Sequence, residues 1–241
     1  MVRALKSLAG PQNSLAQAGN AGVSGGIRLR PSSYFQTLDP PAGANNYRAD
    51  LDISSGDFKA GDLLVAIALA TSAFDGTTRT EISTADWTEV KTTSGSLTGN
   101  ARIFMKISDG TEDTVRGESL RSGGLFFFAI VGASLPDATD ITNANAVSST
   151  ASTSLTSVSA LSDRTGDANL MFSFARTAIW VPAATNTDFF SLGSVVSQDS
   201  ASGSTAILHL ADFAGSGALA VDGNVSGSDS RIFFRFALRE K

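Results

Sequence analysis

The chain has 241 residues, of which 42% are hydrophobic, and this length and composition allow one large β-domain with a hydrophobic core. It contains no cysteine, which excludes disulfides, thiol chemistry and thiolate metal sites. The net charge is −5, and no apolar run reaches the roughly 18 residues that a membrane-spanning helix needs.

The first 47 residues differ from the rest of the chain in composition and charge. Residues 1–38 carry four basic side chains and no carboxylate, which leaves a net charge of −9 on the remainder. Residues 10–46 are rich in Gly, Ala, Asn and Pro, a composition that buries too little apolar surface to fold alone. We therefore predict an extended basic arm, residues 1–47, that docks on an acidic surface outside the chain.

The arm contains the side chains that we expect to anchor it. Residues 2–9 match a short amphipathic helix that Gly10-Pro11 ends, and a helix of two turns needs a packing partner to be stable. The predicted anchoring residues are the basic and large apolar side chains of the arm: Arg3, Leu5, Lys6, Leu8, Arg28, Leu29, Arg30, Tyr34 and Phe35.

Other roles for the arm have less support in the sequence. The stretch MVRALKSLAG lacks an apolar core of signal-peptide length, so nothing in it directs secretion or membrane insertion. Four spaced basic residues form a poor phosphate track, so nucleic acid is not a predicted partner.

Strand patterns begin after the arm. The apolar run GDLLVAIALA, residues 61–70, predicts a strand buried on both faces, and residues 123–133 form a similar run. Ser, Thr and Ala dominate residues 144–162, for which we predict an edge strand and a loop. Further strands are predicted at 101–108, 169–178, 206–213 and 218–221.

The last strand, residues 231–240, has a period of two over ten residues. Its inward side chains are predicted to be Ile232, Phe234, Phe236 and Leu238, and its outward ones Arg235 and Arg239. Asp-Gly turns separate several of the runs. The pattern predicts an all-β fold, an antiparallel β-sandwich or jelly roll with an extended N-terminal arm, whose body is one domain at 48–241.

Two motifs of nucleophilic catalysis lack their structural context. Ser24 lies in a G-x-S-x-G match within the arm, where no predicted strand precedes it. His209 is the only histidine, and Asp212, three residues on in the same strand, would point to the opposite face. We therefore predict no catalytic serine and no catalytic triad.

Oxygen-rich turns suggest two further alternatives. Residues 222–227 match the first half of a calcium loop, but Phe233 stands where a bidentate Glu is needed, so a hairpin turn is the simpler interpretation and a cation at Asp222 stays open. Asp109, Glu112 and Asp113 match the carboxylates of a glycosidase, although Asp also favours turns for backbone reasons. No catalytic residue, metal or cofactor is predicted.

Aromatic side chains are the candidates for ligand contact. Trp87 follows Asp86 at the start of a predicted strand, and we expect it to anchor the core. Trp180 precedes Val181-Pro182 and is expected at a rim. Together with Tyr47 it is the predicted contact for a glycan, because exposed tryptophans favour interfaces.

The ordered series GDLLVAIALATS, DWTEV, ARIFMKISDGTEDTV, GGLFFFAIVGAS and NLMFSFARTA, within residues 56–180, resembles a known module. It is similar to a β-sandwich found in structural proteins of tailed phages and phage-like gene transfer agents, among them head spikes, head fibres and tail appendages. The resemblance implies a virion protein that is assembled in the bacterial cytoplasm. It brings no catalytic residues.

These features lead to the hypothesis of a non-enzymatic virion structural protein. We expect it to decorate a capsid as a head spike or fibre, anchored by its arm to capsid or other virion proteins, and to form a trimer or pentamer. The alternative is a carbohydrate-binding appendage at a spike or tail tip that contacts a host surface polysaccharide. A hydrolase is the third hypothesis and lacks a convergent acid–base set. The sequence is compatible with a position of the protein on the head or on the tail of the particle.

Overall fold

We describe the chain from a computed structural model, and every regular element in its described part is a β-strand. All strand pairs there are antiparallel, which confirms the predicted all-β class. No helix among the described residues could cross a membrane. The described residues are 26–30, 32–33, 35–38, 47–70, 81–82, 86–95, 99–120, 124–148, 166–175, 180–182, 194–199, 204–212, 223–225 and 229–241.

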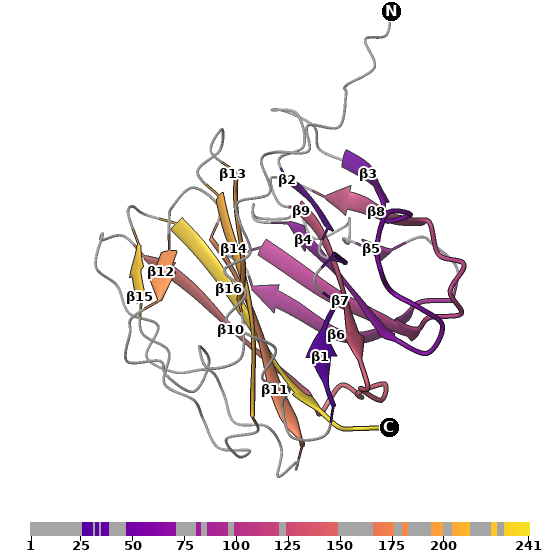
Figure 1. Ribbon diagram of the computed structural model, residues 1–241. Helices are drawn as coiled ribbons and strands as arrows, with labels where there is room; N and C mark the ends of the chain where they lie inside the picture. The colour runs from indigo at the N-terminus through magenta and orange to yellow at the C-terminus, as the bar shows by residue number, and fades with distance from the viewer. Residues whose placement is uncertain are drawn as a thin grey trace, which may run out of the picture.

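The first sheet lies in the middle of the molecule (Figure 1). Its strand order is β1-β9-β4-β7-β6, and β2 also pairs with β9, beyond β1 along the same edge. Its strands are β1 (Arg28–Leu29), β2 (Phe35–Leu38), β4 (Leu63–Ala70), β6 (Thr88–Gly95), β7 (Gly99–Ile107) and β9 (Gly124–Val131).

The second sheet packs against one face of the first. Its strand order is β10-β16-β11-β14-β13. The C-terminal strand β16 lies between β10 and β11, so the end of the chain is built into the sheet. The strands are β10 (Ile141–Ser148), β11 (Ala168–Ala175), β13 (Ser194–Asp199), β14 (Ser204–Asp212) and β16 (Asp229–Leu238).

Two smaller sheets complete the described part. The order β3-β8-β5 forms a sheet on the other side of the first sheet, and β12 pairs with β15 (Figure 1). These strands are β3 (Tyr47–Asp52), β5 (Glu81–Ile82), β8 (Thr114–Leu120), β12 (Trp180–Pro182) and β15 (Gly223–Val225).

A single hydrophobic core joins the two large sheets. Phe126 of the first sheet meets Phe172 of the second edge-on, with ring centroids 5.0 Å apart. Phe128 likewise meets Phe236 at 6.5 Å. All four side chains are at most 1% exposed. Because alternate residues of a strand share a face, these phenylalanines define the inner faces of both sheets.

A second core lies on the opposite face of the first sheet. Leu64, Ala66 and Phe127 point to it and pack with Val115 of β8. Trp87 packs against this cluster with its ring 6.4 Å from Phe127, which confirms the prediction that Trp87 anchors a core. The first sheet is therefore buried on both faces, as the continuous apolar run at 61–70 predicts.

The strand predictions outside the arm agree with the structure wherever it describes them. In β16, Phe234, Phe236 and Leu238 are fully buried. The edge strand predicted within 144–162 corresponds to β10, which within the described part of the chain pairs only with β16 and lies at the edge of the second sheet. The strand predicted at 218–221 lies outside the described residues.

Arg235 is predicted to face outward, and it does lie on the face of β16 opposite Phe234 and Phe236, but that face is covered. The side chain of Arg235 is fully buried, and its Nε donates to Asn169 Oδ1 at 3.0 Å. Desolvation lowers the pKa of Arg235 to about 10, which leaves the guanidinium protonated at neutral pH. Alternation fixes which face a side chain is on, and it does not fix whether solvent reaches that face.

Candidate functional site

The structure describes only part of the predicted anchoring set. Phe35 opens β2, whose backbone is described without its side chains. Three further residues, Arg28, Leu29 and Arg30, lie in or next to β1. The remaining anchoring residues lie outside the described residues: Arg3, Leu5, Lys6, Leu8 and Tyr34.

The residues around β1 are built into the body of their own chain. Ile27 is fully buried in the core between the two large sheets, and Leu29 packs against that core. Arg28 and Leu29 pair with β9, and the Arg30 N–H donates to the carbonyl of Ala129 at 3.0 Å. Among these four side chains, Arg28 is the exposed one.

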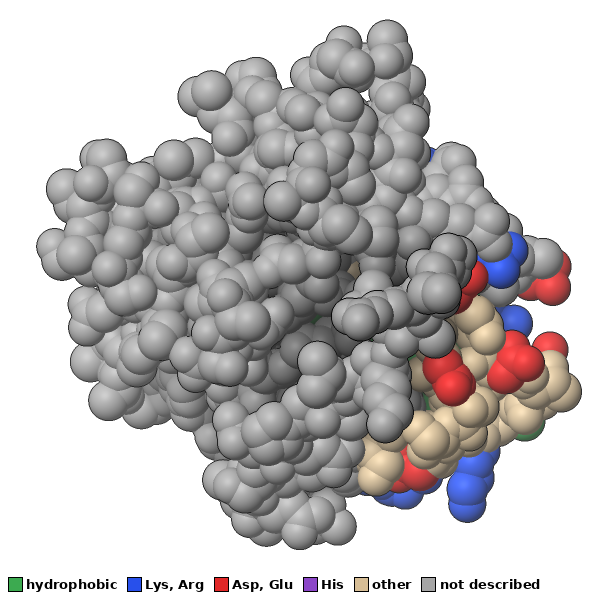
Figure 2. Space-filling view, turned by 90° about the horizontal axis from the view of Figure 1, so that it is seen from above, with side chains coloured by type: hydrophobic (Ala, Val, Ile, Leu, Met, Phe, Trp, Pro, Cys, Tyr) green, Lys and Arg blue, Asp and Glu red, His purple; other side chains and the backbone are tan. Residues whose placement is uncertain are grey.

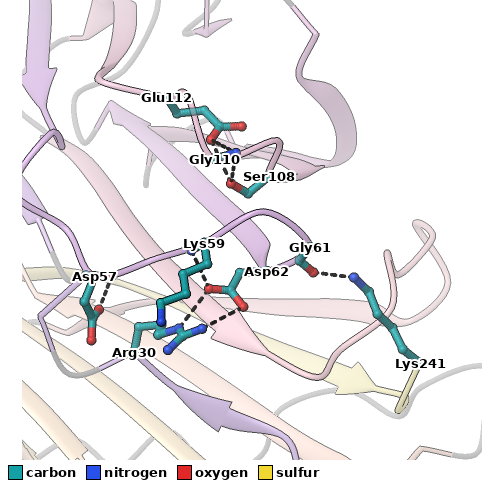
Figure 3. Close-up of polar contacts among 10 residues, drawn as sticks. Arg30, Asp57, Lys59, Gly61, Asp62, Ser108, Gly110, Glu112 and Lys241 are labelled. Atoms are coloured by element: carbon teal, nitrogen blue, oxygen red, sulfur yellow. Dashed lines mark hydrogen bonds and ion pairs between the residues drawn. The ribbon is translucent and has the colours of Figure 1, made fainter.

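A bidentate ion pair holds the end of this stretch (Figure 3). Arg30 Nε donates to Asp62 Oδ2 at 2.8 Å, and a terminal guanidinium nitrogen donates to Oδ1 at 3.2 Å. The Asp62 side chain is 7% exposed and also accepts the Lys59 N–H at 2.8 Å. The hydrogen bond with Asp62 raises the pKa of Arg30. A carboxylate this buried needs its cation, since an unpaired charge there is costly.

A second polar contact follows three residues later. Ser33 is fully buried, and its hydroxyl donates to Asp57 Oδ1 at 2.6 Å. Asp57 and Asp62 both belong to the loop 53–62, which joins β3 to β4. We call the contacts of Ile27, Arg30 and Ser33 with the body the clamp.

The C-terminal residues reach the same corner of the fold. The Lys241 N–H donates to the Gly132 carbonyl at 3.0 Å, and Lys241 Nζ donates to the Gly61 carbonyl (Figure 3). Gly132 has φ +75°, and a Cβ there would lie 3.1 Å from the Gly26 carbonyl oxygen. Glycine therefore permits the close approach of the N-terminal segment to the end of β9.

The sequence analysis missed the partners of this segment. Ile27 and Leu29 alternate with Arg28 and Arg30, which is a strand signal of only four residues within a Gly-rich stretch. Asp62 occurs in a Gly-Asp pair, which is also typical of turns. Arg30 and Asp62 are 32 positions apart in the sequence, and nothing in either pattern shows that their segments contact each other.

The part of the described surface that is visible from above is charged. It carries interspersed acidic and basic side chains with few hydrophobic ones (Figure 2). Elsewhere in the described part, Asp52, Asp57 and Asp109 are exposed, and Arg116 of β8 pairs with Asp50 of β3 at 2.6 Å. This mixture is typical of a solvated surface.

The predicted glycan contacts lie in two different sheets. Tyr47 begins β3 and Trp180 begins β12, and the side chains of both lie outside the described set. Trp180 is opposite Val225, and Pro182 is opposite Gly223. The backbone thus brings Trp180 next to β15, which lies within the predicted calcium-like loop 222–227, and it does not bring Tyr47 there. A strand at Gly223–Val225 differs from the hairpin turn predicted for this stretch.

Glu112 closes the turn between β7 and β8. One of its oxygens accepts from Lys106 Nζ at 2.8 Å and the other from the Ser108 hydroxyl at 2.7 Å. Its carboxylate also accepts the N–H groups of Asp109 and Gly110 at 3.1 and 3.2 Å. Burial alone would raise the pKa of Glu112, but these hydrogen bonds outweigh it and hold the pKa below its usual value.

The neighbouring carboxylates also serve the turn. Asp109 accepts from the hydroxyl and the N–H of Thr111, and these bonds lower the pKa of Asp109. Asp113 is exposed, and its carbonyl accepts the Ile53 N–H at 2.8 Å. A glycosidase needs one carboxyl group with a raised pKa to act as the acid. The lowered pKa values of Asp109 and Glu112 instead fit the turn interpretation.

The other motifs are placed only in part. Ser24 and Asp222 lie outside the described residues. His209 lies in β14 opposite Met171, and Asp212 ends the same strand. No group of three or more histidine, aspartate or glutamate side chains that could hold a metal ion occurs among the described residues.

Comparison with known proteins identifies no relative of this chain. No protein-family profile matches the chain. No curated protein and no solved structure is significantly similar to it.

Proposed function

We propose that the chain is a non-enzymatic structural protein of a phage-like particle, a spike or fibre that decorates the capsid surface. Its body would be a β-sandwich of the jelly-roll kind, and residues 1–25 would attach it to capsid or other virion proteins. Assembly would take place in the bacterial cytoplasm. The two large sheets that share one core support a sandwich-like body.

The observation that carries this proposal is the clamp. A segment that anchors the protein must itself be attached firmly to the folded body. The clamp provides this attachment, because Ile27 is buried in the core between the two large sheets, and Arg30 and Ser33 bond to carboxylates of the loop 53–62. We therefore assign the anchoring role to the residues that precede the clamp. Of Arg28, Leu29 and Arg30, Arg28 has the exposed side chain.

Charge favours a protein surface as the partner of residues 1–25. This stretch has Arg3 and Lys6 and no carboxylate, whereas residues 39–241 carry a net charge of −9. Leu5 lies between the two basic residues in the sequence and Leu8 follows them, and both apolar side chains suit a shallow groove. Many copies on one particle would multiply such weak single contacts by avidity.

Deletion of residues 1–25 is expected to leave a folded protein that no longer joins particles. The deletion removes Arg3, Leu5, Lys6 and Leu8 and keeps every contact of the clamp. Incorporation is measured as copies per purified particle by quantitative mass spectrometry, and folding is measured by circular dichroism. We expect at least a tenfold drop in copies.

The matched control is the Arg28→Ala variant, which removes one solvated basic side chain and leaves residues 1–25 intact. It is expected to be incorporated at no less than half the normal level. Normal incorporation of the deletion variant would assign the anchor to another part of the chain. Absence of the full-length protein from purified particles would contradict the particle role itself.

A carbohydrate-binding appendage is the second candidate function. The pairing of β12 with β15 favours it, because β15 lies within the oxygen-rich stretch 222–227 and its pairing places the backbone of Trp180 opposite Val225. Tryptophan combines a large apolar ring with a polar N–H group, which suits a ligand that has both apolar and polar faces.

The Trp180→Ala variant is expected to lose glycan binding on an array of bacterial surface polysaccharides if this second function holds. The drop in affinity should be about five- to thirtyfold, since stacking of one aromatic ring on a sugar contributes about 1–2 kcal/mol. Trp87→Phe is the control, because Trp87 packs in the second core. Equal binding by Trp180→Ala and the full chain would exclude Trp180 as the contact.

A further inference from the structure

We propose that the turn 108–113, held closed by Glu112, is an acid-sensitive latch that keeps residues 26–33 on the folded body. In this arrangement ionised Glu112 fixes the turn, the turn fixes the loop 53–62, and the loop holds the clamp. Protonation of Glu112 releases the N-terminal segment while the two large sheets stay folded. This inference does not depend on the particle role.

The turn binds both ends of the loop through backbone hydrogen bonds. At one end, the Ile53 N–H donates to the Asp113 carbonyl at 2.8 Å. At the other end, the Ser108 N–H donates to the Asp62 carbonyl at 2.8 Å. The Gly61 N–H donates in return to the Ser108 carbonyl, also at 2.8 Å. The position of the loop therefore depends on the position of the turn.

Close packing also couples the turn to the loop. Gly110 has φ +87°, and a Cβ there would lie 3.2 Å from the Ala60 nitrogen. Glycine permits this approach of the two backbones. Ala60 directly precedes Gly61 and Asp62, so we expect a shift of the turn to displace the part of the loop that holds Arg30.

Both carboxylate oxygens of Glu112 are used in the closed turn. Oε1 accepts from Lys106 Nζ at 2.8 Å and from the Asp109 N–H at 3.1 Å. Oε2 accepts from the Ser108 hydroxyl at 2.7 Å and from the Gly110 N–H at 3.2 Å. A protonated carboxyl turns one of its oxygens into a donor, so one of these two sets of donors loses its acceptor. The Glu112 side chain is 8% exposed, and a donor left unpaired at such a site is costly.

Two carboxylates of the loop connect it to the N-terminal segment (Figure 3). Asp62 forms the bidentate pair with Arg30, and Asp57 accepts the Ser33 hydroxyl. A bidentate pair depends on the exact placement of both planar groups. Displacement of the loop backbone therefore weakens the attachment of the segment.

The direction of the pH effect follows from the electrostatics of the turn. The hydrogen bonds of Glu112 hold its pKa below the usual value, so the ionised form stabilises the folded turn. This stabilisation is complete above the ordinary pKa of a glutamate, and it is lost as the pH falls through the lowered pKa. The charged groups around the latch in the described part are Lys106 of β7, Asp109 and Asp113 of the turn, Asp57, Lys59 and Asp62 of the loop, and Arg30 and Lys241, which contact the loop.

Hydrogen exchange of the full chain, followed by mass spectrometry, tests the latch. The Glu112→Gln variant keeps the size of the side chain and leaves one acceptor oxygen in place of two. Peptides that cover residues 26–33 report on the segment, and those that cover 108–113 report on the turn. Peptides from β16 report on global unfolding. The control is Glu89→Gln, which makes the same substitution in an ion pair between β6 and Arg102 of β7, outside the turn and the loop.

At neutral pH, Glu112→Gln is expected to lower the exchange protection of residues 26–33 by at least about tenfold, because buried donors of the turn lose their acceptor. The protection of β16 should change less than about twofold, and Glu89→Gln should leave residues 26–33 within the same limit. Acidification to about pH 3.5 should lower the protection of the segment in the full chain, and much less in Glu112→Gln. Asp57 and Asp62 are present in both proteins, so the difference between the two responses belongs to Glu112.

Three results would overturn the proposal. In the first, Glu112→Gln speeds exchange in the turn and leaves residues 26–33 unchanged, so that the turn moves without the loop. In the second, β16 loses as much protection as the segment, so that the segment does not open separately. In the third, the full chain and Glu112→Gln respond equally to acid, so that Glu112 is not the group that titrates.

Discussion

Replacing Arg30 with alanine is expected to lower the free energy of unfolding by about 3–5 kcal/mol. In the intact pair the Asp62 side chain is 7% exposed, and the substitution leaves this carboxylate with a single N–H donor from Lys59. The bidentate partner that offsets its desolvation is lost. Urea denaturation followed by circular dichroism measures the change.

The matched control for this substitution is Arg28→Ala. Both arginines lie in the same short stretch, but Arg28 is exposed and makes no described ion pair. Its replacement is expected to change the free energy of unfolding by less than about 0.5 kcal/mol. The double variant Arg30→Ala/Asp62→Ala should be more stable than Arg30→Ala alone, because it removes the uncompensated charge. A loss below about 0.5 kcal/mol for Arg30→Ala would contradict the clamp.

Much of the fold could be predicted from local patterns. The run at 63–68 is apolar without interruption because β4 is covered by a sheet on each face. The ten-residue alternation of β16 likewise follows from one inner face that contains Phe234 and Phe236. Both signals arise from side-chain burial along one strand, which a sequence records directly.

The features that could not be predicted depend on contacts between distant segments. Arg235 has the same alternation in the sequence whether its face is solvated or covered. The third sheet, which makes the first sheet a middle layer, depends on how β3, β5 and β8 pair. Periodicity within one strand carries no information about such pairing.

The candidate site illustrates the same limit. The basic composition of residues 1–38 separates them from the acidic remainder, and it suggests that all of these residues belong to one extended arm. The structure places Ile27, Leu29 and Arg30 on the folded body. What separates Ile27, Leu29 and Arg30 from the rest of the basic stretch is the buried partner Asp62 and the space in the core for Ile27. Both are properties of the tertiary structure.

The most direct test of whether the clamp is part of the folded body compares the stability of two truncations of the N-terminal segment. Deletion of residues 1–25 removes Arg3 and Lys6 and keeps the clamp, so the free energy of unfolding should stay within about 0.5 kcal/mol of the full chain. Deletion of residues 1–35 also removes Ile27, Arg30 and Ser33. It therefore exposes a gap in the core and leaves Asp62 without its cation.

The larger deletion is expected to lower the free energy of unfolding by at least about 4 kcal/mol. Burial of an isoleucine contributes about 1.5–3 kcal/mol, and breaking a buried ion pair costs about 3–5 kcal/mol. Urea unfolding of both truncations under one set of conditions gives the comparison. A difference of several kcal/mol between them is the predicted result. Equal stability of the two truncations would contradict the claim that the clamp is part of the folded body.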